Sequence, residues 1–339
     1  MACAIPLTYP SNATYPTPMT FDQSLAYKNG NWAPLSEISW SVTDLGTTHG
    51  AMLVERLRTI GGRLHDVAEH LTRLADGAEQ LGISWPPNGE SLSQLCDELV
   101  DRNQALLEQE SDLGIVLLLS PGDPGVDRAL TSTSTLMGHV VPLPFVQLAH
   151  WYEHGANLHF ASTRNVPAEC WSPSIKTRSR LQYFLADRNL GRNGSTIAGQ
   201  AASQGTQGNR LPGSIAVLLS TRNFVTETSI SNLLLIDKNR VMRSPPLEDI
   251  LHGVSLKTVC EIASSMNLPV EFSDIQPDDF YTASEVLMTG TTGCLWSAVT
   301  IEGHPIGNGQ PGPICTQLQE AWQKRVGFDF TVQAFQRFT

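Results

Sequence analysis

Short apolar segments that end in polar turns recur along this chain of 339 residues. Lys176, Glu227 and residues 289–292 all fall at or beside such turns. A strand that gives way to a polar turn tends to aim side chains into a cleft. Helical periodicity fills much of the sequence between these segments, so the pattern indicates a mixed α and β fold with a cleft that carries reactive groups.

These three groups, in this order, suit the chemistry of pyridoxal 5′-phosphate. The Lys176 amine could hold an aldehyde cofactor as a Schiff base, and the Gly-Thr turn at 289–292 could cradle a phosphate. Glu227 stands among Val225, Thr226 and other strand formers, where a buried carboxylate needs a partner. A protonated pyridine nitrogen is such a partner, and the ion pair would keep the ring electron-withdrawing.

Length, charge and cysteine usage limit the class of protein. The length predicts about two domains, which we place at residues 1–150, with a loose N-terminal arm, and 151–339. A net charge of -11 without a basic block disfavours nucleic acid as a partner. No stretch approaches the roughly twenty apolar residues of a membrane span, and six scattered cysteines are typical of reduced thiols, so we expect a cytoplasmic protein.

The first half predicts helices packed on strands. A hairpin is expected from Ser24, with its turn at Asn29 and Gly30. An apolar stripe between residues 67 and 81 predicts a helix, which Asp66 and Glu69 would open with a capping box. A second helix is expected over 92–107 and a strand over 115–119, before a proline-rich stretch at 141–145.

The second half predicts mostly strands. Leu181, Phe184 and Leu185 would form the apolar face of a helix after Lys176. Residues 189–213, rich in Gly, Ser, Gln and Asn, predict a long loop that could act as a lid. Further elements are expected as strands at 215–219, 224–228, 233–236, 285–288 and 296–301, and as a helix at 255–266.

With these parts in order, the chain resembles the class IV aminotransferases. These are the fold-type IV pyridoxal phosphate enzymes, and they include branched-chain aminotransferases, D-amino-acid aminotransferases and 4-amino-4-deoxychorismate lyase. The resemblance covers nearly the whole chain after the N-terminal arm. It rests on motifs at residues 50–58, 69–74, 175–177, 225–232, 251–255, 289–292 and 307–313, which follow the family's order.

The resemblance implies a fold, a cofactor and an assembly. We expect an α+β protein with a small α/β N-terminal domain and a larger C-terminal pseudo-barrel domain, and pyridoxal 5′-phosphate in the cleft between them. Lys176 would form the Schiff base and then shuttle a proton between the substrate Cα and the cofactor. Glu227 would hold the ring nitrogen. A homodimer is expected, because active sites in the family borrow a loop from the neighbouring subunit.

The phosphate site follows from the same resemblance. Gly253, Val254 and Ser255 open a helix whose free N–H groups favour an anion. The remaining members of the predicted phosphate site are Arg73, as counter-charge, with Gly290 and Thr291 as further donors.

Substrate binding is where the sequence departs from its relatives. Val54 stands where D-amino-acid aminotransferases carry an aromatic residue, and their Arg-x-His pair is absent after Leu119. The backbone of Thr292 and Gly293 could bind a substrate carboxylate instead. We expect amino-group transfer between an amino acid and a 2-oxo acid.

Two further functions are alternatives to this expectation. Arg180, four residues after Lys176, looks more like the lyase branch, so 4-amino-4-deoxychorismate lyase, which releases pyruvate, is the first alternative. A catalytically silent, cofactor-binding member of the fold is the second. The sequence determines neither the side-chain class nor the stereochemistry of the substrate.

A zinc hydrolase is a remote alternative. His150, Glu153 and His154 match the H-x-x-E-H pattern of inverted zinc peptidases. That chemistry needs a helix that presents both histidines on one face. The nearby prolines, the Trp-Tyr pair and Gly155 favour a strand or a linker instead, so we expect aromatic packing and no metal there.

Overall fold

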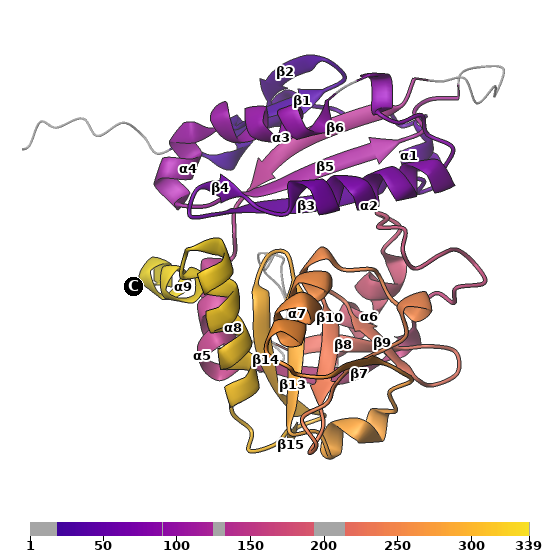
Figure 1. The fold of residues 1–339 in the computed structure, drawn as a ribbon. Coiled ribbons are helices and arrows are strands. Elements are labelled where there is room, and N and C mark those ends of the chain that lie inside the picture. Colours follow the sequence, from indigo (N-terminus) through magenta and orange to yellow (C-terminus); the bar gives the residue numbers. More distant parts are fainter. Residues whose placement is uncertain (1–18, 90, 125–132, 193–213, 339) are drawn as a thin grey trace, which may run out of the picture.

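The computed structural model describes residues 19–89, 91–124, 133–192 and 214–338. The chain forms two lobes, each built on its own sheet (Figure 1). The path changes from the first sheet to the second between Val141, where β6 ends, and Phe145, where α5 begins. None of the helices in the described ranges combines the length and the hydropathy needed to cross a membrane.

The smaller lobe contains an antiparallel sheet in the order β2-β1-β6-β5-β3-β4. Asn29 and Gly30 have positive φ angles in the turn between β1 and β2, which confirms the predicted hairpin. The predicted strand at 115–119 is β5. The strands are β1 Leu25–Lys28, β2 Asn31–Pro34, β3 Leu53–Ile60, β4 Arg63–Leu64, β5 Gly114–Ser120 and β6 Thr135–Val141.

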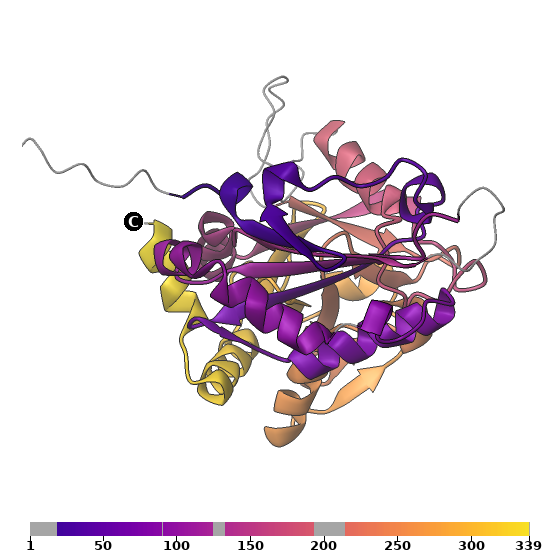
Figure 2. The ribbon, with the colours of Figure 1, turned by 90° about the horizontal axis from the view of Figure 1, so that it is seen from above.

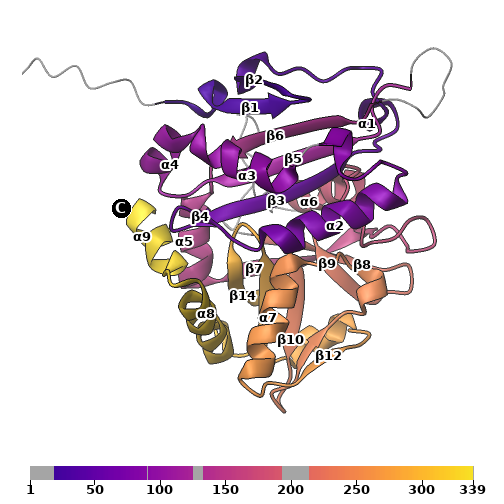
Figure 3. The ribbon, with the colours of Figure 1, turned by 45° about the horizontal axis from the view of Figure 1, so that its top comes forward.

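Helices α2, α3 and α4 cover one face of this sheet (Figures 2 and 3). Leu74 and Ala78 of α2 pack with Leu53 and Leu57 of β3, because residues separated by an even number of positions on a strand share a face. The helices of this lobe are α1 Leu45–Thr48, α2 Val67–Gln80, α3 Leu92–Asp101 and α4 Gln104–Glu110.

Two details predicted for these helices were wrong. Asp66 precedes α2 in a left-handed conformation, with φ 54°, and its side chain makes no capping hydrogen bond. The helix expected over 92–107 breaks at Asn103. Its side-chain amide donates to the Leu25 carbonyl at 2.9 Å and accepts from the Leu25 N–H at 2.8 Å, so the break ties the helices to β1.

The larger lobe contains a curled sheet in the order β12-β11-β10-β13-β14-β7-β8-β9, with β15 paired to β14. Strand β7 runs parallel to both β14 and β8, whereas β13 and β14 form an antiparallel hairpin. All the strands predicted for this half are present. The strands are β7 Ala156–Arg164, β8 Ser214–Leu219, β9 Val225–Thr228, β10 Asn232–Ile236, β11 Met242–Ser244, β12 Val270–Phe272, β13 Glu285–Gly290, β14 Cys294–Ile301 and β15 His304–Pro305.

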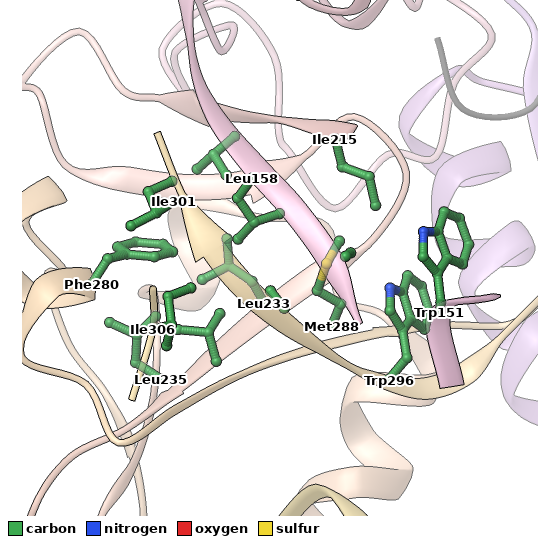
Figure 4. Close-up of a cluster of buried hydrophobic side chains, with 14 of the residues drawn as sticks. Trp151, Leu158, Ile215, Leu233, Leu235, Phe280, Met288, Trp296, Ile301 and Ile306 are labelled. Carbon is green, nitrogen blue, oxygen red and sulfur yellow. The ribbon is translucent and has the colours of Figure 1, made fainter. Parts of the chain in front are cut away.

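Both faces of this sheet are buried. Leu233 and Met288 lie in the cluster inside the curl, where Trp151 and Trp296 stack with ring centroids 5.0 Å apart (Figure 4). Leu234 and its neighbours face outward, under α7 and α8. The helices are α5 Phe145–His154, α6 Leu181–Arg192, α7 Val254–Ser265, α8 Pro313–Val326 and α9 Phe330–Phe338, with 3₁₀ turns in the whole chain at Phe21–Gln23, Leu35–Glu37, Pro87–Gly89, Leu247–Asp249 and Pro277–Tyr281.

Three predictions for the larger lobe need correction. The segment around His150 was expected to be a strand or linker, but it is helix α5, because the prolines precede the helix and Gly155 ends it. The predicted apolar face of α6 is exposed: Leu181 is 67% and Phe184 50% exposed, while Ala186 and Leu190 pack on β8. The predicted loop begins too early, since α6 continues to Arg192, and residues 193–213 lie outside the described part of the chain.

A buried carboxylate connects the two lobes. Asp112 accepts hydrogen bonds from the Thr59 hydroxyl at 2.5 Å and from the side-chain amide of Gln333 in α9 at 2.7 Å. Arg58 lies 3.7 Å from the same carboxylate and donates to the Thr292 carbonyl at 2.7 Å. Strand β3 is therefore attached to both the last helix and the β13–β14 turn.

Candidate active site

A cavity of about 350 Å³ lies between the lobes. A larger, more open groove between α2 and α7 shares Arg73, Gly253 and Val254 with it, but the groove lacks both Lys176 and Glu227, which line the cavity. All the cofactor and substrate residues predicted from the sequence line this cavity. They are Val54, Arg73, Lys176, Glu227, Gly253, Val254, Ser255, Gly290, Thr291, Thr292 and Gly293.

Lys176 is held against the start of β3. Its carbonyl accepts from the Val54 N–H at 2.9 Å, and the Arg178 N–H donates to the Met52 carbonyl at 2.8 Å. Burial lowers the pKa of the Lys176 ammonium to about 7, and Arg73 also lowers it, against an opposing effect of Glu55. The side chain therefore supplies a substantial fraction of neutral amine near pH 7.

Glu227 lies buried in the middle of β9. Burial raises the pKa of its carboxyl group, although the Tyr183 hydroxyl donates to it at 2.5 Å and the Leu251 N–H at 3.4 Å. Neither of these donors carries a positive charge. The site therefore suits a cationic donor that arrives with a ligand, because a buried carboxylate gains most from a charged partner.

The first turn of α7 forms one end of the cavity. Helical hydrogen bonding begins with the Lys257 N–H, which donates to the Gly253 carbonyl at 3.0 Å, so the N–H groups of Val254 and Ser255 have no partner within the helix. A Cβ atom on Gly253 would lie 2.0 Å from the Asn232 side-chain oxygen. Only glycine fits here, and the exposed N–H groups suit an anion.

Arg73 reaches this end of the cavity from α2. Its guanidinium donates to the Glu55 carboxylate at 2.5 and 3.0 Å and to the His252 carbonyl at 3.0 Å. His70 lies 2.9 Å from the same carboxylate. Burial raises the pKa of Glu55, but Arg73 and His70 outweigh that effect and hold it well below its usual value. An ionised Glu55 therefore fixes the position of Arg73.

The turn between β13 and β14 closes another side of the cavity. Gly290 pairs with Cys294, which leaves Thr291, Thr292 and Gly293 as the connecting residues. Arg58 donates to the Thr292 carbonyl, and the Tyr152 hydroxyl donates to the Gly293 carbonyl at 2.9 Å. Both carbonyls are thus held by side chains that do not line the cavity, which fixes the orientation of the turn.

Sequence reasoning missed four polar residues of the cavity wall. Tyr183 was missed because the apolar residues of α6 were assigned to the wrong face, which turned attention from its polar side. Arg56 could have been found from strand alternation, since it shares a face with Val54. The other two arginines follow the lysine closely, and one of them was noted only as a mark of the lyase branch. The four residues are Arg56, Arg178, Arg180 and Tyr183.

The zinc-peptidase pattern lies outside this cavity. Helix α5 places the rings of His150 and His154 side by side, with centroids 5.0 Å apart. Glu153 lies 3.5 Å from His154, and both side chains are exposed. Within the described ranges, no group of three or more His, Cys, Asp or Glu side chains is arranged to hold a metal ion.

Comparison with known proteins supports the resemblance found in the sequence. The family model for "Amino-transferase class IV" matches residues 52–301. A Methanocaldococcus jannaschii protein provisionally named a branched-chain-amino-acid aminotransferase is 26% identical over 88% of this chain and 94% of its own length. A D-alanine aminotransferase of Staphylococcus aureus is 23% identical over 88% of this chain and 97% of its own length.

A solved structure has the same fold. It is a thermophile's branched-chain amino acid aminotransferase, complexed with N-(5′-phosphopyridoxyl)-L-glutamate, and it superimposes with a TM-score of 0.73 at 22% sequence identity. The match covers 91% of this chain and 96% of that one. The expected fold class is thereby confirmed. The family model spans most of the chain, and the chain therefore belongs to the class IV aminotransferase family of enzymes.

Proposed function

We propose that this aminotransferase uses pyridoxal 5′-phosphate held covalently by Lys176, and that it exchanges amino groups between an amino acid and a 2-oxo acid. The observation that carries the proposal is the low pKa of Lys176 in a cavity that also contains Glu227 and the α7 terminus. The family match and the phosphopyridoxyl ligand of the solved relative support it.

The cavity residues fit the cofactor by charge and by space. The phosphate would bind the N–H groups of Val254 and Ser255, next to the fixed Arg73 guanidinium. Gly253 leaves the room that this approach needs. Glu227 would pair with the ring nitrogen and keep it protonated. When bound, the cofactor withdraws electrons from the substrate Cα–H bond.

The residues of this chain then supply proton transfer and orientation. Near pH 7 Lys176 exists partly as the neutral amine, so it can accept the proton from the substrate Cα and return it. Tyr183 holds the carboxylate of Glu227 in one orientation. Arg58 and Tyr152 hold the turn at 291–293, whose backbone N–H groups would meet the substrate carboxylate.

The decisive experiment maps the covalent bond. Purified protein is incubated with pyridoxal 5′-phosphate, reduced with borohydride and digested, and mass spectrometry should find the added pyridoxyl group on Lys176. Lys176→Ala should bind the cofactor without this modification and lose about 10³-fold or more of its turnover. The matched control is Lys238→Ala, an exposed lysine. Modification of another lysine, or full activity of Lys176→Ala, would refute the proposal.

A lyase is the second candidate, because Arg180 lies four residues after Lys176 and lines the same cavity. Adding 4-amino-4-deoxychorismate would then yield 4-aminobenzoate and pyruvate. An aminotransferase instead converts its cofactor to the amine form when given an amino acid alone. The two products distinguish the candidates in one series of assays.

The proposal includes a cytoplasmic homodimer. Leu181 and Phe184, which are 67% and 50% exposed on α6, are large apolar side chains typical of a protein interface. Light scattering on the purified protein should give twice the chain mass of 36.9 kDa. Replacing both side chains with serine should shift the protein toward the monomer.

A further inference from the structure

Three arginines, Arg56, Arg178 and Arg180, form a cluster on the cavity wall, which we term the arginine cluster. Arg56 comes from β3, and the other two follow Lys176 along the chain. Backbone hydrogen bonds pair Lys176 with Val54 and Arg178 with Met52. Since alternate residues of paired strands share a face, this pairing directs Arg56 and Arg178 toward the cavity on either side of Val54.

The surroundings of the arginine cluster contain no compensating acid. Among the described residues, no carboxylate lies within 4.0 Å of any of the three guanidinium groups. Burial lowers the pKa of Arg56, and the charges of Arg178 and Arg180 lower it further. The sheet continues from Arg56 through Val116 to His139. Burial lowers the pKa of His139, so this neighbour adds no negative charge either.

Arg180 differs from the other two members because it is already held in place. Its guanidinium donates to the Ser229 carbonyl and lies 4.3 Å from the centre of the Tyr183 ring. It also lowers the pKa of Lys176, which puts it on the lysine side of the cluster. The side chains of Arg56 and Arg178 make no hydrogen bond to any described residue. These two guanidinium groups are therefore available to a ligand.

The number of charges exceeds what one carboxylate would balance. Arg73 is paired with Glu55 and faces the proposed phosphate site, so it does not serve the substrate. The substrate side then carries Arg56, Arg178 and Arg180. A planar guanidinium pair suits a carboxylate through two parallel hydrogen bonds, whereas a branched aliphatic side chain would leave both charges unpaired in a confined space.

We propose that Arg56 and Arg178 bind the side-chain carboxylate of the substrate, so that the enzyme prefers dicarboxylic amino acids and 2-oxo acids to branched-chain ones. This inference rests on the proposed transaminase function. It assigns a substrate class to the cavity and gives the selectivity to two residues that lie beside Lys176 without taking part in proton transfer.

The first test measures binding without turnover. Calorimetry is performed on the cofactor-loaded enzyme with glutarate, which has two carboxylates, and with 4-methylpentanoate, which has one and a branched apolar end. Arg56→Gln and Arg178→Gln should each weaken glutarate about 10- to 100-fold, the effect of losing a charged hydrogen bond. The affinity for 4-methylpentanoate should change less than about threefold. Arg63→Gln, an exposed arginine of β4, is the matched control.

The second test measures selectivity in turnover. The amine form of the enzyme reacts with 2-oxoglutarate or with 4-methyl-2-oxopentanoate, and kcat/KM is compared. The wild type should prefer 2-oxoglutarate, and the double variant should lose that preference. Equal losses for both oxo acids would assign the arginines to the α-carboxylate and overturn the inference, as would a wild-type preference for the branched acid.

The same experiments separate this inference from the function on which it rests. A variant that still forms the covalent bond at Lys176 and still transfers amino groups, with unchanged selectivity, overturns the inference alone. A wild-type protein that takes up no pyridoxal 5′-phosphate overturns both.

Discussion

Two buried glutamates border the cavity, one from each lobe, and their surroundings shift their pKa values in opposite directions. Glu55 on β3 has Arg73 and His70 as partners, and its pKa lies well below the usual value. Glu227 on β9 has only a phenol and a backbone N–H, and its pKa is raised. Both side chains are buried, so the charges beside them decide the difference.

The comparison separates a structural carboxylate from one suited to a ligand. The charge of Glu55 is already matched inside the protein, so its role is to fix Arg73. The charge of Glu227 is unmatched by any cation within 4.0 Å among the described residues, so it gains most when a cationic ligand binds. Substituting each glutamate should therefore damage different properties of the enzyme.

The largest expected effect is on folding. Glu55→Gln should lower the free energy of unfolding by about 3–5 kcal/mol, because it leaves the buried Arg73 guanidinium without its anion. Urea unfolding monitored by circular dichroism measures this change. The exposed Glu79 on the same helix as Arg73 provides the control Glu79→Gln. A loss below about 1 kcal/mol would show that the pair is not a structural element.

The next effect is on catalysis. Glu227→Gln keeps the shape of the side chain but removes the charge that would face the ring nitrogen, so kcat should fall by about 10²–10³-fold. The stability should stay equal or rise, since a buried acid with a raised pKa is costly to ionise. Retention of wild-type kcat would contradict the role proposed for Glu227.

The pH dependence of stability sharpens the contrast. Glu55 stabilises the fold above its ordinary pKa of 4.5, and that contribution is lost as the pH falls. Glu227, with a raised pKa, opposes folding above 4.5, and that cost disappears as the pH falls. Relative to its glutamine variants, the wild type should lose stability on acidification at site 55 and gain it at site 227, by up to about 1.4 kcal/mol per pH unit. Parallel curves for the two variants would contradict the assignment.

The smallest effect concerns the hydrogen bond to Glu227. Tyr183→Phe removes a bond that lowers the pKa of this carboxyl, so the pKa should rise and the acid limb of the kcat profile should move to higher pH. Turnover at neutral pH should fall by about three- to tenfold, as expected for one buried hydrogen bond. Tyr281→Phe, on an exposed tyrosine, is the control. An unmoved acid limb would exclude this coupling.

Local periodicity explains which parts of the fold were predictable. Strands β8, β10 and β14 are short apolar runs between turn residues, and α2 and α7 have long apolar stripes, so each element is specified by its own residues. Helix α6 was oriented wrongly because its larger apolar residues are exposed, and the sheet that covers Ala186 is formed by distant strands. The break at Asn103 also depends on a distant strand, β1.

The site divides in the same way. The glycines and threonines of the proposed phosphate site belong to recognisable local motifs, and the structure brings them together in one cavity. The arginine cluster depends on the pairing of β3 with the segment after Lys176, which no local pattern encodes. The pairing of Tyr183 with Glu227 likewise needs the tertiary fold, because the two residues lie on different elements.

The hydrogen bond from Gln333 to Asp112 has a practical consequence for handling the protein. Asp112 also binds Thr59, beside the strand segment that carries Arg56 and Arg58, so helix α9 supports one wall of the cavity. A bulky fusion or immobilisation handle attached after residue 339 would load that helix directly. Affinity tags should therefore be placed at the amino terminus, and surface-coupled biosensors should be anchored there as well.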